Sequence, residues 1–454
     1  MVFQERVADI LGQYPQLKCY NHGLATFAMP EGVSRESVFQ SFKDATDLIV
    51  EKIPWLADQV VFTPRGDGYS PKVHTAPWPK DGPAHVLLRQ RDSTNELPTY
   101  EEMLKAQGPA SMLDGKILCP TPGFPESYDE AIIGPAAPVL MQLNWVTGGV
   151  IVTFSNQHNF LDGTAIFQFI LLLSKALNGE EITEKTLAPS FIDPQTSIPL
   201  YGDDEAQRDH SYLLAKNGPP PIVASADTPP ASWAYFRFKK SAIPKVKAVA
   251  SDPEGFDKDV PFISTGDAIS AFYWKRLTAN RVKNGADPTT SAKFSRAIDA
   301  RSAVGLTWEY MGQMVYFSSI RLTYQEIIDL PLSTVASRLR KDLNEVNTEH
   351  SVRSYATFLS KIKDKRDVTY SGPNNREIDI GSSSMAQAKL MLKFGVLGIP
   401  DMIRRPTLGG INGALYFYPP DSPGDVTLLA CLNDQDMNSM RNDPEWSECI
   451  EYIG

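Results

Sequence analysis

The chain has 454 residues, of which 42% are apolar and 22% are charged, and its formal net charge at pH 7 is −10. This length exceeds what a single hydrophobic core normally serves, so we expect at least two domains. The negative charge argues against a nucleic-acid partner, because binding phosphate requires concentrated lysine and arginine.

The sequence also bears on cellular location. The first residues lack the basic start and apolar run of a secretory signal, and no apolar segment reaches membrane-spanning length. The four cysteines have neither metal nor redox spacing and are expected to be reduced; they are Cys19, Cys119, Cys431 and Cys449. We therefore expect a cytoplasmic protein with no membrane partner.

In the first half of the chain, residues 23–30 are predicted to form a strand. A helix follows, capped by Ser34 and ended by Pro54. Residues 139–158 are predicted to form a hairpin around Thr-Gly-Gly, whose second strand ends at His158. The next helix is predicted to run from about Asp162 to an Asn-Gly stop.

Residues 198–232 lose all periodicity and contain "NGPPPIVASADTPPAS". They predict a crossover linker between a domain of residues 1–197 and a domain of residues 233–454. The second domain is predicted to contain a strand near its start, a helix capped near Ser264, and a strand ending at Asp-Ala-Arg301. A further helix and two paired strands complete a mixed α/β pattern.

His158 is the main candidate for chemistry. A neutral imidazole at a strand end, facing a crevice between domains, can take a proton from a bound hydroxyl and make it a nucleophile. Asp162 could pair with an arginine and brace the loop that holds His158, and Gly163 permits a bend or a close backbone approach. On the residues alone, a lone histidine with a nearby aspartate is more often a packed or helix-capping pair than a catalytic one, and both interpretations stay open at this point.

Other chemistries fit the sequence less well. It has no Gly-x-Ser-x-Gly nucleophile elbow, no metal-ligand spacing among its six histidines, and no glycine-rich phosphate loop. We therefore expect neither a hydrolase of that type nor a metal site.

The segment His158-Asn-Phe-Leu-Asp162-Gly163 matches the His-x-x-x-Asp-Gly motif of the BAHD acyltransferases, which depend on coenzyme A. "MQLNWVTGGVIVTFSNQH", "FISTGDAISAFYWK", "FSRAIDAR" and "EWSECIEYIG" resemble the fungal trichothecene 3-O-acetyltransferases in order along nearly the whole chain. The resemblance implies an α/β fold of two similar-sized, chloramphenicol-acetyltransferase-like domains with mixed β-sheets. It also implies an interdomain tunnel and a monomer.

The same resemblance implies the reaction, an O-acyl transfer from acetyl-CoA to a hydroxylated secondary metabolite such as a terpenoid. His158 would be the general base between the two substrates. The catalytic-motif acid Asp162 would point away from them and pair with Arg301, whose planar fork matches a carboxylate. Asp299 would brace the site in a similar way, and Gly163 would support it.

Coenzyme A carries phosphates, which require cations or a helix start. Lys239 and Lys240, together with Arg237 and the capped segment at Ser264, are candidates for this contact. A solvated basic strand edge is the alternative interpretation of these residues.

The sequence departs from the family at its second motif, Asp-Phe-Gly-Trp-Gly. Only "KFGVLGIPDMIRRP" is present, with Lys393 in place of the acid and no tryptophan. Because Lys393 would repel Arg301, we expect this loop to be routed toward solvent. We also expect Phe394–Gly398 and the helix start at 264 to lie around His158.

Three alternative functions remain open at this point. A peptide-forming condensation domain would have a second histidine where this chain has Gln157. A ligand-binding homologue could keep the fold without activity. An acyltransferase scaffold could also have been adapted to isomerisation or cyclisation, with His158 still acting as base.

Overall fold

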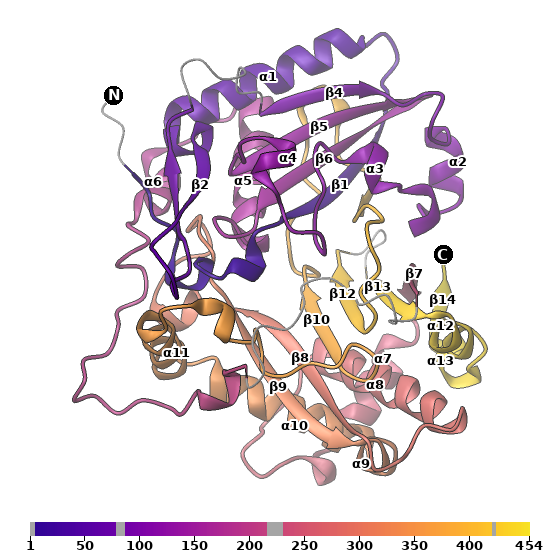
Figure 1. Ribbon diagram of the computed structural model, residues 1–454. Helices are drawn as coiled ribbons and strands as arrows, with labels where there is room; N and C mark the ends of the chain where they lie inside the picture. The colour runs from indigo at the N-terminus through magenta and orange to yellow at the C-terminus, as the bar shows by residue number, and fades with distance from the viewer. Residues whose placement is uncertain (1–4, 79–86, 216–229, 420–423) are drawn as a thin grey trace.

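A computed structural model describes residues 5–78, 87–215, 230–419 and 424–454. The chain forms two α/β bodies, one above the other in Figure 1. A five-stranded sheet lies in the upper, first body and a seven-stranded sheet in the lower, second body, and a separate two-stranded hairpin lies beside the first. Both sheets mix parallel and antiparallel pairs, as the sequence predicts.

The first body is built on the hairpin of β5 and β6. Every residue of both strands is buried, and their turn contains Gly148 at φ +82°, a backbone conformation that favours glycine. Helices α1 and α5 pack against each other over this sheet. The sheet order is β11-β1-β6-β5-β4, with bounds β1 (Tyr20–Ala28), β4 (Leu88–Asp92), β5 (Val139–Val146), β6 (Gly149–Gln157), β11 (Met402–Arg404), α1 (Arg35–Lys52) and α5 (Gly163–Leu177).

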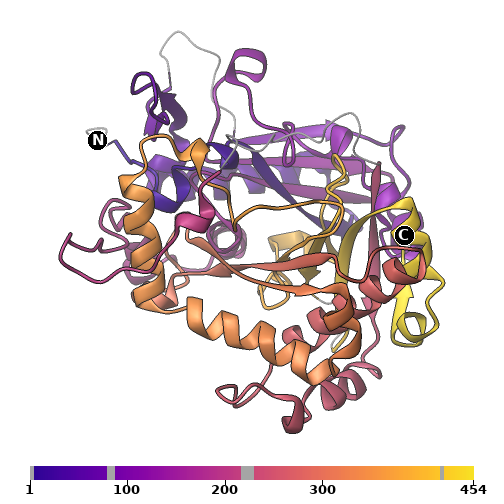
Figure 2. The same ribbon diagram turned by 60° about the horizontal axis from the view of Figure 1, so that its bottom comes forward.

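The second body has its long helices α8 and α10 packed on each other, on the side of the sheet turned away from the first body (Figure 1, Figure 2). Its sheet order is β14-β7-β13-β12-β10-β8-β9. The bounds are β7 (Ala231–Phe238), β8 (Ser291–Asp299), β9 (Val315–Thr323), β10 (Ile380–Ser384), β12 (Ala414–Tyr418), β13 (Val426–Asn433), β14 (Ile450–Tyr452), α7 (Ile243–Ala250), α8 (Thr265–Lys283) and α10 (Leu332–Val346).

Shorter elements surround these two sheets. The small hairpin consists of β2 (Gln59–Thr63) and β3 (Lys72–Ala76). The remaining helices are α2 (Tyr100–Lys105), α3 (Gly115–Leu118), α4 (Glu130–Ile133), α6 (Glu184–Leu187), α9 (Tyr324–Asp329), α11 (Glu349–Lys361), α12 (Asp434–Arg441) and α13 (Pro444–Cys449).

The predicted helix starts are confirmed at the level of single hydrogen bonds. The side chain of Ser34 accepts from the backbone N–H of Ser37 and begins α1. Ser264 and Asp267 form a reciprocal capping box at the start of α8, and Asp162 caps α5 by accepting from Ala165. These caps are local patterns, which explains why the sequence alone identified them.

The two bodies exchange segments, which corrects the predicted division into residues 1–197 and 233–454. Strand β11, from the second half, pairs antiparallel with β1 as the edge of the first sheet. Leu11 and Tyr14, from the start of the chain, lie in a hydrophobic cluster with Tyr310 and Tyr355 of the second body. Each body therefore depends on residues that the predicted boundary assigns to the other.

The predicted linker, residues 198–232, is only partly described, because 216–229 lie outside the described residues. Its first part is packed on α11 of the second body. The backbone N–H of Arg208 donates to the hydroxyl of Ser354 at 2.8 Å, and Leu213 is fully buried. Residues 198–215 are thus a docked segment of the second body.

Within the described ranges, no helix combines the length and the apolar character needed to cross a lipid bilayer.

Candidate active site

His158 follows the last residue of β6 and is fixed by backbone contacts at the junction of the bodies. Its N–H donates to the carbonyl of Cys19 at 2.9 Å, which extends the ladder between β6 and β1. The side chain of Asn159 donates to the carbonyls of Gly12 and Tyr14 at 2.6 and 2.8 Å. Because Tyr14 packs on the second body, these bonds hold the His158 loop against it.

The imidazole of His158 presents one nitrogen to the protein and the other outward. Its Nδ1 is enclosed and has no hydrogen-bond partner among the described residues, although part of the residue is accessible. Nε2 is therefore the nitrogen available to a substrate. Burial lowers the pKa of His158 below its usual 6.5, while the charge of Asp162 and the nearby backbone carbonyls raise it only partly back. The ring is neutral at pH 7 and can accept a proton.

The carboxylate of Asp162 is directed to Arg301, as predicted. Two parallel bonds join them, Nη1 to Oδ2 and Nη2 to Oδ1, each 2.9 Å long. Oδ1 also accepts from Ala165 N–H at 2.9 Å and Oδ2 from Met314 N–H at 2.8 Å. With four bonds received, the carboxylate makes none to the imidazole of His158.

Arg301 uses all five of its N–H donors. Besides the pair with Asp162, its Nε donates to the carbonyl of Tyr310 at 3.0 Å, Nη2 to that of Gly312, and Nη1 to Asp299, the last two at 2.9 Å. Burial would lower its pKa, but the charges of Asp162 and Asp299 hold that pKa above its usual value. Because Arg301 follows β8 and Asp162 precedes α5, this fully bonded pair joins the two bodies.

Asp299 and Gly163 complete the neighbourhood. The partly exposed carboxylate of Asp299 accepts from the hydroxyl of Thr164 at 2.7 Å, so it also links β8 to the start of α5. A Cβ on Gly163 would meet only the ring of Phe167, at 3.9 Å, and its φ is not left-handed. No described protein atom therefore requires a glycine at position 163, contrary to the expected close approach.

The residues proposed for coenzyme A phosphates do not form one cluster. The hydroxyl of Ser264 is engaged with Asp267 in the capping box. The Nζ of Lys239 donates to the carbonyls of Ser447 and Glu448 at 3.2 Å each. Lys239 and Lys240 do line a surface depression of about 700 Å³, but Ser264 does not; the other lining residues are Arg237, Ser241, Asp425 and Glu451.

The expected position of the altered second motif is wrong. The carbonyl of Lys393 accepts from Ser174 at 2.8 Å and from Asn178 at 2.7 Å, at the far end of α5 from His158. A helix of 15 residues is about 22 Å long, so this loop cannot surround the histidine. Phe394 is buried in the first core, whereas Lys393, Val396 and Ile399 are exposed, so the expected route toward solvent holds for only part of this loop.

The anchor of this loop is aromatic. The ring of Phe394 lies 5.3 Å from that of Phe27 and 6.0 Å from that of Phe154, centroid to centroid. The side chain of Lys393 is exposed at the end of α5, far from Arg301, so the expected repulsion does not arise.

Comparison with known proteins gives these features a context. Residues 138–447 match the Transferase family, and residues 19–177 match the trichothecene 3-O-acetyltransferase-like N-terminal domain. The chain belongs to the Transferase family. This transferase is 40% identical to the O-acyltransferase pigD of Monascus ruber over 99% of both chains. It is 38% identical to the O-acetyltransferase epaC of Aspergillus niger, over 99% of this chain and 97% of that one.

Solved structures agree with this membership. The crystal structure of Fusarium sporotrichioides TRI101 complexed with coenzyme A and T-2 superposes on the transferase with a TM-score of 0.91, at 28% identity and 100% coverage of both chains. Vinorine synthase shares the fold at 14% identity, with a TM-score of 0.61. The predicted fold class and BAHD-type resemblance are confirmed. The transferase is an acyltransferase, a function that its named relatives favour over isomerisation or ligand binding.

Sequence reasoning missed the side chains that make the His158 loop rigid. Gln157 accepts from the N–H of Asn159 at 2.9 Å, and Asn156 donates to the carbonyl of Leu161. A run of buried polar residues, Ser-Asn-Gln, at the end of an otherwise apolar strand was the available signal, because buried polar groups need partners.

Proposed function

We propose that the protein is an O-acetyltransferase that moves the acetyl group of acetyl-CoA to a hydroxyl of a small secondary metabolite such as a terpenoid. The observation that carries this proposal is the neutral, partly accessible imidazole of His158 at the junction of the two bodies. The complexes of TRI101 with coenzyme A and a trichothecene support the choice of both substrate classes.

In the proposed reaction, His158 acts as the general base. Because Nδ1 is enclosed by protein while part of the residue is accessible, we assign the proton to Nδ1, which leaves the lone pair of Nε2 free for the substrate. Nε2 takes the hydroxyl proton while the alcohol oxygen bonds to the thioester carbon. The carbon–sulfur bond then breaks, and the proton passes from Nε2 to the departing thiolate. No acyl-enzyme forms, because the thioester is already activated.

Asp162 is a positioning residue in this proposal. Its oxygens are occupied by Arg301 and by two backbone N–H groups, so it has no free lone pair to direct at the imidazole. Through the loop between β6 and α5 it sets where His158 stands. Asp299 and Arg301 continue that brace into the second body.

Two deep residues support the proposed interdomain tunnel. Desolvation is the largest influence on the pKa of both His158 and Tyr416, so protein surrounds them closely, yet both are partly accessible. Tyr416 lies in the middle of β12 and His158 at the end of β6, on facing bodies. We infer an internal space between these strands, with the alcohol and the thioester arriving from its two ends.

The depression around Lys239 and Lys240 is the proposed site for coenzyme A phosphates. Its lining carries three basic side chains and two acidic ones, a formal charge of +1. Ser264 is withdrawn from this set because its hydroxyl caps α8. Since one chain supplies both bodies of the site, we propose that the enzyme works as a monomer, and we place it in the cytoplasm.

The test measures acetyl transfer from acetyl-CoA to each member of a panel of hydroxylated terpenoids. Release of the coenzyme A thiol is the signal that monitors the reaction. The wild type should acetylate at least one of them, and His158→Ala should lower the rate at least about 100-fold. His350→Ala is the matched control, because His350 is exposed and bonded to Tyr201, by a hydrogen bond of 3.0 Å and a ring contact, rather than placed beside His158. A His158→Ala variant that keeps more than about a tenth of the rate would contradict the proposal.

A further inference from the structure

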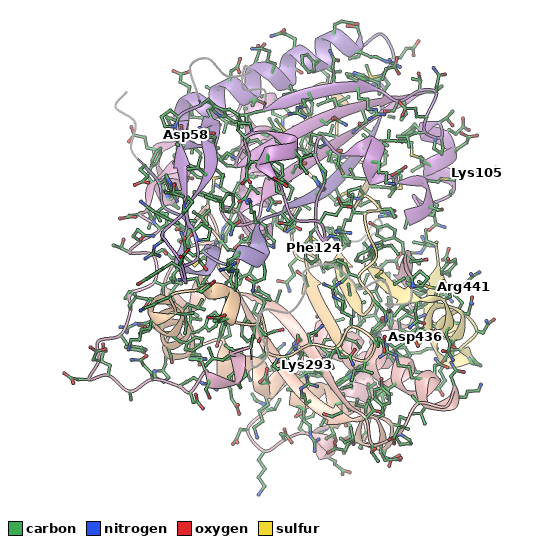
Figure 3. The ribbon with its side chains drawn as sticks, in the orientation of Figure 1. Asp58, Lys105, Phe124, Lys293, Asp436 and Arg441 are labelled. Carbon is green, nitrogen blue, oxygen red and sulfur yellow. The ribbon has the colours of Figure 1, made fainter. Side chains whose placement is uncertain are left out.

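Arg405 directly follows β11, where the second half of the chain crosses onto the first sheet. Its side chain is 6% exposed and contacts three segments that are distant in sequence. The guanidinium carbon lies 4.8 Å from the ring centroid of Trp233 and 5.6 Å from that of Tyr416. Nη2 donates to the carbonyl of Phe124 at 2.8 Å, and Figure 3 shows Phe124 between the two bodies.

The position of Arg405 is tightly fixed. Its backbone N–H donates to the hydroxyl of Tyr235 at 2.6 Å, and that hydroxyl lies 3.3 Å from its carbonyl. The rings of Trp233 and Tyr416 are stacked at 15°, with centroids 5.6 Å apart, and both lie beneath the guanidinium. The guanidinium is therefore held in place before any ligand arrives.

The charge of Arg405 has no counter-charge in the described part of the chain. Its Nη1 is enclosed and unpartnered, and no ion pair of the described residues includes it. Its charge lowers the pKa of six groups that are neutral at pH 7; they are Cys19, His22, Cys119, Tyr416, Tyr418 and Cys431. Burying an unpaired cation is costly, and Arg301, another buried arginine between the two bodies, is fully paired.

Arg405 belongs to the same interior region as His158. Phe124, whose carbonyl accepts from Arg405, donates its N–H to the carbonyl of Tyr20 at 2.8 Å, and Tyr20 pairs with Gln157, the residue before His158. The charge of Arg405 reaches His22, whose Nδ1 lies 2.7 Å from the hydroxyl of Ser155, three residues before His158 on β6. Tyr416, beneath the guanidinium, keeps accessible surface although burial is the main influence on its pKa.

We propose that Arg405 binds an anionic oxygen of the acceptor, as in a carboxylate or an enolate, while His158 receives the hydroxyl of the same molecule. This inference rests on the proposed function and adds to it the chemical class of the acceptor. The flat aromatic walls and the enclosed, unpartnered Nη1 group suit one oxygen on an apolar, planar group. The phosphates of coenzyme A carry more negative charge than one guanidinium neutralises, which favours the acceptor as the source of the anion.

The test measures binding, so it does not depend on turnover. Thermal unfolding of the wild type is followed with 1-naphthoate, with its uncharged analogue 1-naphthamide, and with acetyl-CoA. The same titrations are made with Arg405→Met, which keeps bulk and removes the charge. Arg281→Met is the control for losing a buried arginine elsewhere, because Arg281 is paired with Asp436 through Nε at 2.9 Å.

We expect 1-naphthoate to stabilise the wild type and to bind at least about tenfold more tightly than 1-naphthamide. In Arg405→Met this preference should vanish, while stabilisation by acetyl-CoA persists. Without ligand, Arg405→Met should melt within about 2 °C of the wild type, whereas Arg281→Met should lose several degrees.

Three results would overturn the inference alone. The first is that 1-naphthoate does not stabilise the wild type. The second is that Arg405→Met keeps the full preference for 1-naphthoate over 1-naphthamide. The third is that Arg405→Met no longer binds acetyl-CoA, which would assign Arg405 to a phosphate. Absence of stabilisation by acetyl-CoA in the wild type would instead contradict the proposed function.

Discussion

Replacing Asp162 by asparagine separates bracing from direct catalysis. An asparagine can place its oxygen toward one side of Arg301, but its amide N–H₂ then faces donors, the Nη1 of Arg301 and the N–H of Met314. The guanidinium is also left buried without its main counter-charge. Breaking such a pair by removing one partner typically costs about 3–5 kcal/mol. At roughly 2 °C per kcal/mol for a chain of this size, the melting temperature should fall by about 6–10 °C.

The assay combines thermal unfolding with acetyl-transfer kinetics well below the melting temperature. Asp299→Asn is the matched control, because that carboxylate is 39% exposed and shares the same arginine. Because Asp299 is partly exposed and Arg301 would keep Asp162 as its counter-charge, we expect a loss of about 1 kcal/mol or less. An Asp162→Asn variant with an unchanged melting temperature and a 100-fold lower kcat would refute the bracing argument and make Asp162 a direct partner of His158.

Three further predictions follow from buried groups. Because burial lowers the pKa of His158, log kcat/KM should be flat at neutral pH and fall only below 6.5, as the ring gains a proton; a fall beginning above pH 7 would contradict this. Burial and the charge of Arg405 lower the pKa of His22 to about 3 in the folded protein. As the pH falls from 6.5 toward 3, the unfolded chain binds a proton that the folded protein does not, so the free energy of unfolding measured in urea should drop. This drop should be smaller in His22→Asn. Phe394→Ala should cost about 3–5 kcal/mol of unfolding free energy while leaving the KM for acetyl-CoA unchanged, because its ring fills the first core at the far end of α5 from His158.

The parts of the fold that follow from local patterns were predictable. The apolar run of β5 and β6 and the serine caps of α1 and α8 each lie within one segment. Strand β11 has three residues, and its partner β1 lies some 380 positions earlier, so no periodicity reveals it. Ser264 was predicted both as a helix cap, which is confirmed, and as a candidate for coenzyme A phosphates, because a cap and an anion site share the same local sequence.

The residues of the candidate site also differ in whether the sequence could predict them. His158 and Asp162 stand in one motif, and the arginine that meets Asp162 follows a recognisable strand. Arg405 has no such signal, because its neighbours Trp233, Tyr416 and Phe124 come from three separate segments that only the folded chain brings together.

The placement of β11 has a consequence for how the protein is made. The ribosome makes β11 some 380 residues after its partner β1, so β1 waits as an open sheet edge while that part of the chain is synthesised. An unpaired edge of this kind is prone to associate with other chains. Nascent chains stalled anywhere before β11 should therefore recruit chaperones and resist folding, even though nearly all of the first body has already emerged.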